Sequence, residues 1–407
     1  MRNYPNFLEA YCQYAGDQFC PPQFHLWTGL SIIAGALERK VWVKPTAKSL
    51  FPNLYVLLVS HPQVGKSTAL DRGTDLLEHL RAEYNHDFKM IPEQATEAAL
   101  IELMNILSSY QVPQATNNTM FSSGFFYASE ASSSALKNEH GDFNATLTRF
   151  YDCPTVFRKK LKGDKHTTEI PHVCFNVLAG TTFDFLKRLV NEESVMGGLA
   201  SRFIYVTCRD RFVRTPKWGY TRGTDLAMRG KLLADLVEIH KMVGEFKPTP
   251  EFIALWESAH PEHDKYLIGL DSTRVESLKA RKLTNLTKVC MLLSASEGDS
   301  YVLTADHWHK AEKLMEEVMA DNTLILSSAI IGKTDTQAGL NQLILQTLRK
   351  SGGNMRLSDL RKVIIKQGND FAKLMPTLEF MGSAGQVKLD FNGGGNVKLL
   401  ADPDAGL

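Results

Sequence analysis

Residues 54–70 read LYVLLVSHPQVGKSTAL, and this stretch predicts the fold of the chain around it. An apolar run rich in β-branched residues, 54–59, leads into a short turn that closes on the segment GKST (65–68), where a helix can begin. Strand, loop and helix in this order are the context of a phosphate-binding loop. In such a loop the backbone N–H groups and the helix N-terminus point at phosphate oxygens.

The side chains of this loop indicate a site for ATP and Mg²⁺. Lys66 would reach the β- and γ-phosphates, and the Ser67 hydroxyl would ligate Mg²⁺. The usual pattern is G-x-x-x-x-G-K-[ST], and Ser60 stands at the position of its first glycine. The alternative is a chance GKS sequence in a surface turn. The predicted ATP-binding residues of the loop are Ser60, His61, Pro62, Gln63, Val64, Gly65, Lys66, Ser67 and Thr68.

Length and composition predict a globular protein of two or three domains, because 407 residues exceed one ordinary core. The net charge of +1 leaves any nucleic-acid binding to local patches. The six cysteines are scattered without a C-x-x-C pair, so neither a disulfide framework nor a zinc site is indicated. The N-terminus lacks a signal pattern, and the apolar runs are shorter than the roughly 18 residues of a membrane span. We therefore expect a cytoplasmic protein without membrane contact.

Hydrophobic periodicity divides the chain into four parts. Strands alternate with helices up to about residue 222, which predicts an α/β fold with a mostly parallel sheet. The strands then disappear, and the tail has the order of a winged helix: three helices, the third interrupted by Pro376, and two strands around Asn-Gly-Gly-Gly. The predicted parts are an N-terminal helical segment (1–45), a P-loop ATPase core (46–222), a helical lid (223–329) and, after a linker at 330–339, a winged-helix domain (340–407).

Polar residues end two other apolar strands. Glu130 follows the strand in GFFYASE (124–130), where such sheets place their chemistry, and would orient the attacking water. Ser129 would hold a Mg²⁺-bound water but supplies no charge. Thr181 and Thr182 end the next strand, where they would contact the γ-phosphate of ATP or align the water, or else cap the following helix. A glutamate at a strand exit without a catalytic role is the alternative for Glu130.

Arg202 lies in a Ser-Arg-Phe segment after Gly197 and Gly198. Its guanidinium suits bidentate phosphate recognition. Supplied from a neighbouring subunit, it would be a catalytic arginine finger, a group that raises the rate of hydrolysis by about 10³–10⁵. The alternative is an arginine in a surface salt bridge.

Residues 155–173 predict a hairpin with a Lys-Gly-Asp-Lys turn. Five cationic side chains crowd this hairpin against Asp164 and Glu169. A basic hairpin can follow the phosphate backbone of single-stranded DNA through salt-dependent contacts that tolerate any sequence. The alternative is a solvated hairpin without a ligand. The predicted DNA-binding residues are Arg158, Lys159, Lys160, Lys162 and Lys165.

The ordered set of motifs over residues 20–330 resembles a family, the helicase-like P-loop ATPases of phages and prophages that often accompany, or are fused to, primases. The resemblance rests on FHLWTGLSIIAGALER before a strand, NLYVLLVSHPQVGKST, IPEQATEAALIEL, the strand ending in Ser129-Glu130, YDCPTVFRKK and GGLASRF.

The same order is similar to AAA+ replicative helicases of the minichromosome-maintenance type. In those proteins a basic hairpin precedes the sensor strand, an S-R-F segment carries the arginine that acts in trans, and a winged helix closes the chain. The resemblance implies the trans arginine at Arg202 and a second sensor at Arg281. It also implies a pore hairpin, formed by Lys159, Lys160, Lys162 and Lys165. Three positions depart from the family: Ser60 replaces glycine, Ser129 replaces the Walker B aspartate, and Thr181-Thr182 stands where asparagine is common.

These expectations describe a ring-forming, hexameric DNA helicase of a phage or prophage, acting in the cytoplasm of a bacterial host. ATP would be hydrolysed between subunits, with Glu130, Lys66 and Arg202 as the catalytic residues, and a separate protein would supply primase activity. A second hypothesis is a helicase loader or initiator, which uses ATP as a switch and binds duplex DNA through the winged helix. The departures at Ser60 and Ser129 keep this hypothesis open. A third is an ATPase that acts on protein.

Overall fold

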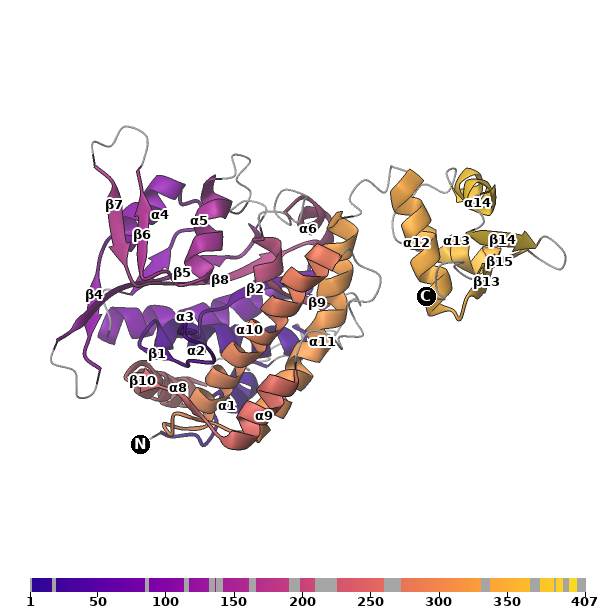
Figure 1. The fold of residues 1–407 in the computed structure, drawn as a ribbon. Coiled ribbons are helices and arrows are strands. Elements are labelled where there is room, and N and C mark those ends of the chain that lie inside the picture. The colour runs from indigo at the N-terminus through magenta and orange to yellow at the C-terminus, as the bar shows by residue number, and fades with distance from the viewer. Residues whose placement is uncertain are drawn as a thin grey trace. The chain divides into compact units, whose positions relative to one another are not determined.

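The chain folds into a mixed α/β architecture around a mostly parallel sheet, shown by the computed structural model in Figure 1. Two units divide it, Met1–Leu326 and Ser327–Leu407. The structure describes residues 2–16, 20–84, 88–112, 117–131, 136, 142–160, 166–189, 198–208, 225–259, 272–330, 337–366, 374–383, 386–390 and 395–400.

The central sheet has the strand order β3-β5-β8-β2-β9, and neighbours along this path are parallel. The short β4 pairs with β5 in the antiparallel direction. Every residue of β2 and β8 is buried, as expected for strands that helices cover on both faces. The strands are β2 (Tyr55–Ser60), β3 (Lys89–Ile91), β4 (Ser108–Tyr110), β5 (Thr119–Ala128), β8 (Val173–Thr181) and β9 (Ile204–Cys208).

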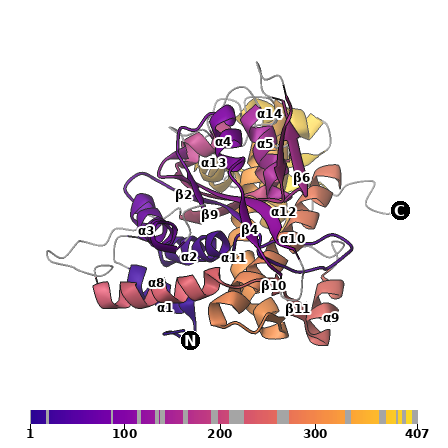
Figure 2. The same cartoon turned by 90° about the vertical axis from the view of Figure 1, so that its left-hand side faces the viewer.

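Helices cover both faces of this sheet. In Figure 1, α2 and α3 lie on one face, and α4 and α5 lie on the other. α2 is buried along almost its whole length because α1, α8 and α10 also pack against it (Figure 2). The helices are α1 (Phe7–Ala15), α2 (Pro22–Leu37), α3 (Lys66–Tyr84), α4 (Glu97–Met104), α5 (Asp142–Tyr151), α6 (Phe183–Leu189), α8 (Leu226–His240) and α10 (Ser272–Glu297), with a 3₁₀ turn, η3 (Ala200–Arg202).

The predicted hairpin is present as two antiparallel strands, β6 (Val156–Lys159) and β7 (Thr168–Pro171). Arg158 pairs with Glu169 in the register of this hairpin. The predicted turn, including Lys162 and Lys165, lies outside the described residues.

The region after residue 222 is mainly helical, but the prediction that strands disappear there is wrong for three short ones. β10 (Gly244–Glu245) pairs with β1 (Val41–Trp42), and β11 (Lys247–Pro248) pairs with β12 (Val302–Leu303). Two-residue strands are too short for hydrophobic alternation to reveal them. The remaining helices of this region are α9 (Pro250–Ser258) and α11 (Ala305–Ile330).

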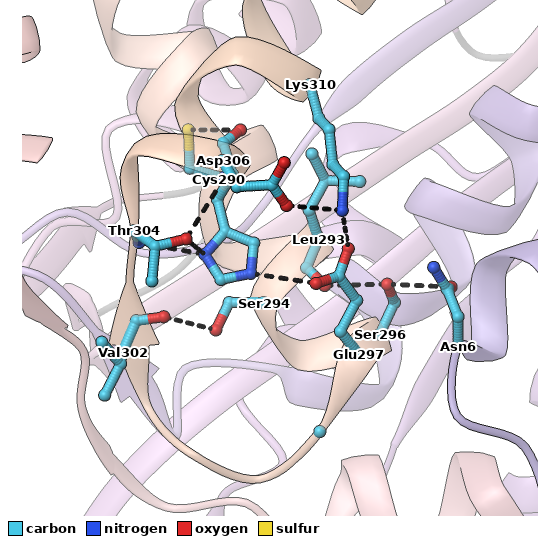
Figure 3. Close-up of polar contacts among 12 residues, drawn as sticks. Asn6, Cys290, Leu293, Ser294, Ser296, Glu297, Val302, Thr304, Asp306 and Lys310 are labelled. Atoms are coloured by element: carbon cyan, nitrogen blue, oxygen red, sulfur yellow. Dashed lines mark hydrogen bonds and ion pairs between the residues drawn. The ribbon is translucent and has the colours of Figure 1, made fainter.

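Polar contacts join the end of α10 to the start of α11 (Figure 3). The Lys310 ammonium contacts Glu297 Oε1 at 2.9 Å and the Asp306 carboxylate at 2.6 Å. The Ser296 hydroxyl donates to Asn6 Oδ1 at 3.3 Å, which links this corner to the N-terminal segment. The Lys310 contacts thus join α10 to α11, and the Ser296 contact joins α10 to the residue before α1.

The unit Ser327–Leu407 has its own core of apolar residues from its helices and strands. Its three-stranded sheet has the order β13-β15-β14, so the prediction of two strands missed β13. Pro376 does not interrupt a helix, because it is the third residue of α14 and the first turn of a helix does not need its N–H. The elements are α12 (Gln337–Lys350), β13 (Asn354–Arg356), α13 (Leu357–Lys366), α14 (Leu374–Ser383), β14 (Val387–Asp390) and β15 (Asn396–Leu399). Most of the predicted linker, 331–336, lies outside the described residues.

Among the described helices, none combines the length and the apolar character that crossing a membrane requires.

Gly73 allows α3 to pack closely on α2. A Cβ atom at Gly73 would lie 2.3 Å from Thr28 Cγ2 and 2.6 Å from Ile32 Cδ1. We therefore expect Gly73→Leu to lower the free energy of unfolding by about 1–3 kcal/mol through overpacking. The control is Gly230→Leu at an exposed position of α8, where a Cβ meets nothing within 4 Å and helix propensity predicts a gain of about 0.5–1 kcal/mol.

Urea unfolding followed by tryptophan fluorescence measures both variants. All five tryptophans precede residue 327, so the signal reports the unit that contains both glycines. Equal unfolding midpoints for the two variants would contradict the packing described for α2 and α3.

Candidate functional site

The loop between β2 and α3 makes a tight turn at the carboxyl end of the sheet. Gly65 has a φ of 78° and Gln63 a φ of 67°, both in the left-handed region. Glycine adopts this region without strain, which explains the residue type at position 65. α3 begins at the next residue, Lys66, and the first N–H groups of a helix have no partners within it. The loop and this helix start therefore offer N–H donors to an anion.

Lys66 is folded into this loop. Its ammonium donates to Ser60 O at 3.3 Å, Ser60 Oγ at 3.2 Å and His61 O at 3.2 Å. Ser60, at the position of the first glycine in the usual pattern, supplies two of these three acceptors. It is fully buried. Burial lowers the pKa of Lys66, and the nearby Glu130 carboxylate opposes that shift.

The other loop residues differ in exposure. His61, Pro62, Gln63 and Ser67 are exposed, Thr68 is half-buried and Val64 is buried. The His61 ring contacts the ring of Phe183 at the start of α6, with centroids 5.2 Å apart. The Ser67 hydroxyl is thus open to solvent in the first turn of α3, where a metal ion bound to phosphates could reach it.

The ends of β5 and β8 meet this loop. Val59 pairs with Thr181 across β2 and β8, and Ala128 pairs with Ala179 across β5 and β8. Between them, a Cβ atom at Gly180 would lie only 2.6 Å from the Ser129 carbonyl oxygen and 3.6 Å from Lys66 Cβ. The missing side chain at Gly180 therefore lets the end of β5 and the start of α3 approach the same point.

The two threonines at the end of β8 have different surroundings. Thr182 Oγ1 accepts the Phe185 N–H at 3.3 Å, so it caps α6, the alternative that the sequence left open. The Thr181 hydroxyl is buried and has no hydrogen-bond partner within the described part of the chain. An unpaired buried hydroxyl costs about 1–3 kcal/mol, so a water or a ligand that hydrogen-bonded to Thr181 would remove this cost.

Sequence reasoning missed two carboxylates beside this site. Glu93 follows β3, and its Oε1 accepts the Ser129 N–H at 2.6 Å. Asp71 lies one turn after Ser67 on α3 and accepts a hydrogen bond from the Tyr127 hydroxyl. Burial, together with the Asp71 and Glu93 carboxylates, raises the pKa of Tyr127. The position of Glu93 after the strand next to β5 was a signal that could have found it.

The described residues contain no cluster of three His, Cys, Asp or Glu side chains arranged to hold a metal ion. Mg²⁺ does not require such a cluster, because it keeps several waters and uses substrate phosphates with one or two protein ligands. The exposed Ser67 hydroxyl and the unpaired Thr181 hydroxyl fit a Mg²⁺-bound nucleotide.

Arg202 lies at the amino ends of the strands, on the side of the sheet opposite the loop. It ends η3, just before β9, and β9 runs parallel to β2. Since β2 has six residues at about 3.3 Å each, roughly 20 Å separates the two edges. The structure therefore does not bring Arg202 to Lys66 and Glu130 of the same chain.

At that opposite edge, Arg202 is held by Asp152. Its guanidinium donates to Asp152 Oδ2 at 2.6 Å and to Gly198 O at 2.7 Å. Arg281 donates to the other oxygen of Asp152 at 3.1 Å. Both guanidinium groups also lie 5.6 Å from the centre of the Tyr151 ring. Arg202 thus makes a salt bridge within its own chain, but its side chain is buried, so it is not the surface salt bridge that the sequence left as its alternative.

The described cations of the hairpin have different partners. Arg158 contacts Glu169 at 2.6 Å, and both side chains are exposed. Lys159 contacts Glu97 Oε1 on α4 at 2.6 Å, which attaches the hairpin to that helix. Lys160 is exposed. An exposed ion pair contributes little to stability, so Arg158 can exchange Glu169 for another anion.

Neither the comparison with protein-family models nor the comparison with curated proteins finds a match for this chain.

The contact between Asp152 and Arg202 predicts a pH-dependent stability. Burial raises the pKa of Asp152, but Arg202, Arg281 and Lys48 outweigh burial and hold it below its usual value. A lowered folded-state pKa stabilises the protein above the unfolded value of about 3.9, and this contribution is lost as pH falls through the folded-state value.

We expect Asp152→Asn to lower the free energy of unfolding by about 1–3 kcal/mol at pH 7, because it leaves the buried Arg202 guanidinium without its counter-charge. The difference from wild type should shrink below about pH 4. Urea unfolding at several pH values measures it, with Glu238→Gln, which removes the exposed contact to Lys241, as the control of small effect. Equal stability of Asp152→Asn and wild type at pH 7 would contradict this account.

Proposed function

We propose that this chain is a P-loop ATPase of the AAA+ type that assembles into a hexameric ring and moves along single-stranded DNA. The observation that carries the proposal is the position of Lys66. It starts α3 at the end of a central parallel strand, beside a buried Thr181 hydroxyl that has no described partner. The N–H donors at the start of α3, the Lys66 ammonium and the Thr181 hydroxyl together suit the phosphates of ATP.

The order of the strands supports hydrolysis at this site. β8 separates β2, which leads into the loop, from β5, which leads to Glu130. Neighbouring strands are about 4.8 Å apart, so the two strand ends are separated by about 10 Å. This separation leaves room for the γ-phosphate and a water between Lys66 and Glu130, opposite Thr181.

The residues would act in a simple sequence. Phosphate oxygens replace Ser60 and His61 as the acceptors of the Lys66 ammonium. Ser67, and Ser129 through a water, would hold Mg²⁺, which would neutralise charge on the phosphates. Glu130 orients the attacking water, and Glu93 holds the Ser129 N–H and with it the end of β5. Catalysis of phosphoryl transfer is mainly such positioning and electrostatic stabilisation.

The location of Arg202 supports a site shared between subunits. Because Arg202 lies roughly 20 Å from the loop of its own chain, it would contact the ATP of a neighbouring chain. In the ring that we propose, that neighbour is one of six identical subunits. Asp152 would then hold Arg202 in place until the neighbour's γ-phosphate competes for the guanidinium.

The remaining assignments follow from this proposal. The hairpin with Arg158, Lys159 and Lys160 would track single-stranded DNA, together with Lys162 and Lys165. The three helices and three-stranded sheet of Ser327–Leu407 would form a winged helix that contacts duplex DNA. The role would be phage or prophage replication in the cytoplasm of a bacterial host, with a separate primase as partner.

A second candidate function is a helicase loader that uses ATP as a switch. Ser129 favours it, because this residue lacks the charge that would help to position Mg²⁺ for fast turnover. The salt bridge between Asp152 and Arg202 also favours slow turnover, since it must open before the arginine can act.

Steady-state ATPase activity with and without single-stranded DNA tests the proposal. We expect DNA to stimulate the wild-type activity severalfold or more. Glu130→Gln and Arg202→Ala should each lose at least tenfold in rate, since a trans arginine contributes about 10³–10⁵ where it is known. Mixing the two variants should restore part of the activity, because a mixed ring contains sites with an intact Glu130 facing an intact Arg202.

Lys66→Ala is the matched control, and it should stay inactive in a mixture with Glu130→Gln, since no site then regains both groups. Absence of any rescue between Glu130→Gln and Arg202→Ala would contradict a shared site. Negligible wild-type turnover with ATP still bound would support the loader instead.

A further inference from the structure

A cavity of about 240 Å³ lies at the edge of the sheet opposite the candidate ATP loop. Its walls come from segment 45–53, from residues 151–153 at the end of α5, from α10 and from Trp256 of α9. Asn53 precedes β2, whose far end carries the loop, so about 20 Å separates the cavity from Lys66. It is therefore a different site from the proposed ATP site.

The charge lining this cavity is mainly positive. Among the described residues, Lys48, Arg281 and Lys288 line it together with one carboxylate, Asp152. That carboxylate already accepts hydrogen bonds from Arg202 at 2.6 Å and from Arg281 at 3.1 Å. Asp152 therefore cannot neutralise the remaining cations, and the described residues that line the cavity carry an excess of positive charge.

Lys288 is the most informative of these cations. It is 1 % exposed, and its ammonium donates to Asn53 O at 2.9 Å and to Asn53 Oδ1 at 2.8 Å. The ammonium also lies 3.8 Å from the centre of the Tyr151 ring. All these direct contacts among the described residues are to neutral groups, and burying a cation without a directly paired anion is costly.

The surroundings of Lys288 lower its affinity for a proton. Burial lowers the pKa of Lys288 to about 8, against the opposing influence of Cys153, Cys174 and Asp152, and Arg281 adds to the lowering. An anion in the cavity would reverse this effect, because it favours the charged ammonium.

The volume limits the size of the ligand. About 240 Å³ lies below the usual 300–1,000 Å³ of pockets for drug-sized molecules. Threonine and serine residues and the aromatic residues Phe51 and Trp256 also line the cavity. Guanidinium, ammonium and hydroxyl donors around a small space are suited to phosphate oxygens.

We propose that this cavity binds a phosphate group, held by Lys288, Arg281 and Lys48. The phosphate comes either from free inorganic phosphate or pyrophosphate, or from the phosphate end of a nucleotide. The proposal does not depend on ATP hydrolysis or on assembly into a ring. It adds a second anion site to the chain, next to the Asp152 contacts of Arg202 and Arg281.

Isothermal titration calorimetry of the full chain carrying Lys66→Ala tests the proposal, because this background removes the lysine of the candidate ATP loop. Sodium pyrophosphate is the first probe and ATP the second. We expect Lys66→Ala to bind pyrophosphate, and the added change Arg281→Gln or Lys288→Met to weaken binding at least tenfold. The added change Lys313→Ala, which removes an exposed cation of α11 outside the cavity, should leave the affinity unchanged.

The outcomes separate the alternatives. Pyrophosphate binding without ATP binding identifies a free anion as the ligand, whereas binding of both that Arg281→Gln weakens identifies a nucleotide phosphate. No pyrophosphate binding by Lys66→Ala, or binding that Arg281→Gln leaves unchanged, would overturn the proposal. Arg281 is half-buried at the rim, so this variant keeps the test valid even if Lys288→Met fails to fold.

Discussion

The close approach of three strand ends at Gly180 is the constraint on which the candidate site depends. β8 lies between β2 and β5, and any side chain at position 180 would collide with the Ser129 carbonyl oxygen, 2.6 Å from its Cβ. With glycine there, the start of α3 and the end of β5 can face the same small volume. Lys66, Glu130 and Thr181 come from three different elements, and this packing brings them together.

Because the strands are parallel, their carboxyl ends lie on one side of the sheet and their amino ends on the other, and the two sides carry different functional groups. The carboxyl edge carries the loop, the exposed Ser67 and the carboxylates of Glu93 and Asp71. The amino edge carries Arg202, Arg281 and Lys288 around Asp152 and the Tyr151 ring. One chain cannot join the two groups across about 20 Å of sheet, whereas adjacent copies in the ring that we propose would place one group against the other.

The sequence predicted the local features of this fold well. The apolar run 54–59 before GKST marks β2, the loop and α3, because all the signals lie within one short segment. The mostly parallel sheet and the basic hairpin also follow from local patterns, periodicity and turn residues. Which of the predicted residues act on ATP, Mg²⁺ or DNA stays a prediction.

Contacts between distant segments were beyond sequence reasoning. Glu93 accepts the N–H of a residue 36 positions later, and Asp152 binds Arg281, 129 positions away. Such partners depend on the order of strands, which periodicity does not reveal. In the sequence, Lys288 looks like an ordinary polar residue of a long helix. Only the folded structure shows that it is buried. β13 has three residues, too few for a clear alternation.

The affinity of Thr181→Val for ATP with Mg²⁺ tests the central claim most directly. Valine keeps the shape of threonine and removes the buried hydroxyl that lacks a partner within the described residues. If that hydroxyl contacts a phosphate, calorimetry should show about tenfold weaker ATP binding, and the ligand-free variant should melt at the wild-type temperature or above it. ATP binding as tight as that of wild type would contradict a phosphate at Thr181 and with it the site assembled around Gly180.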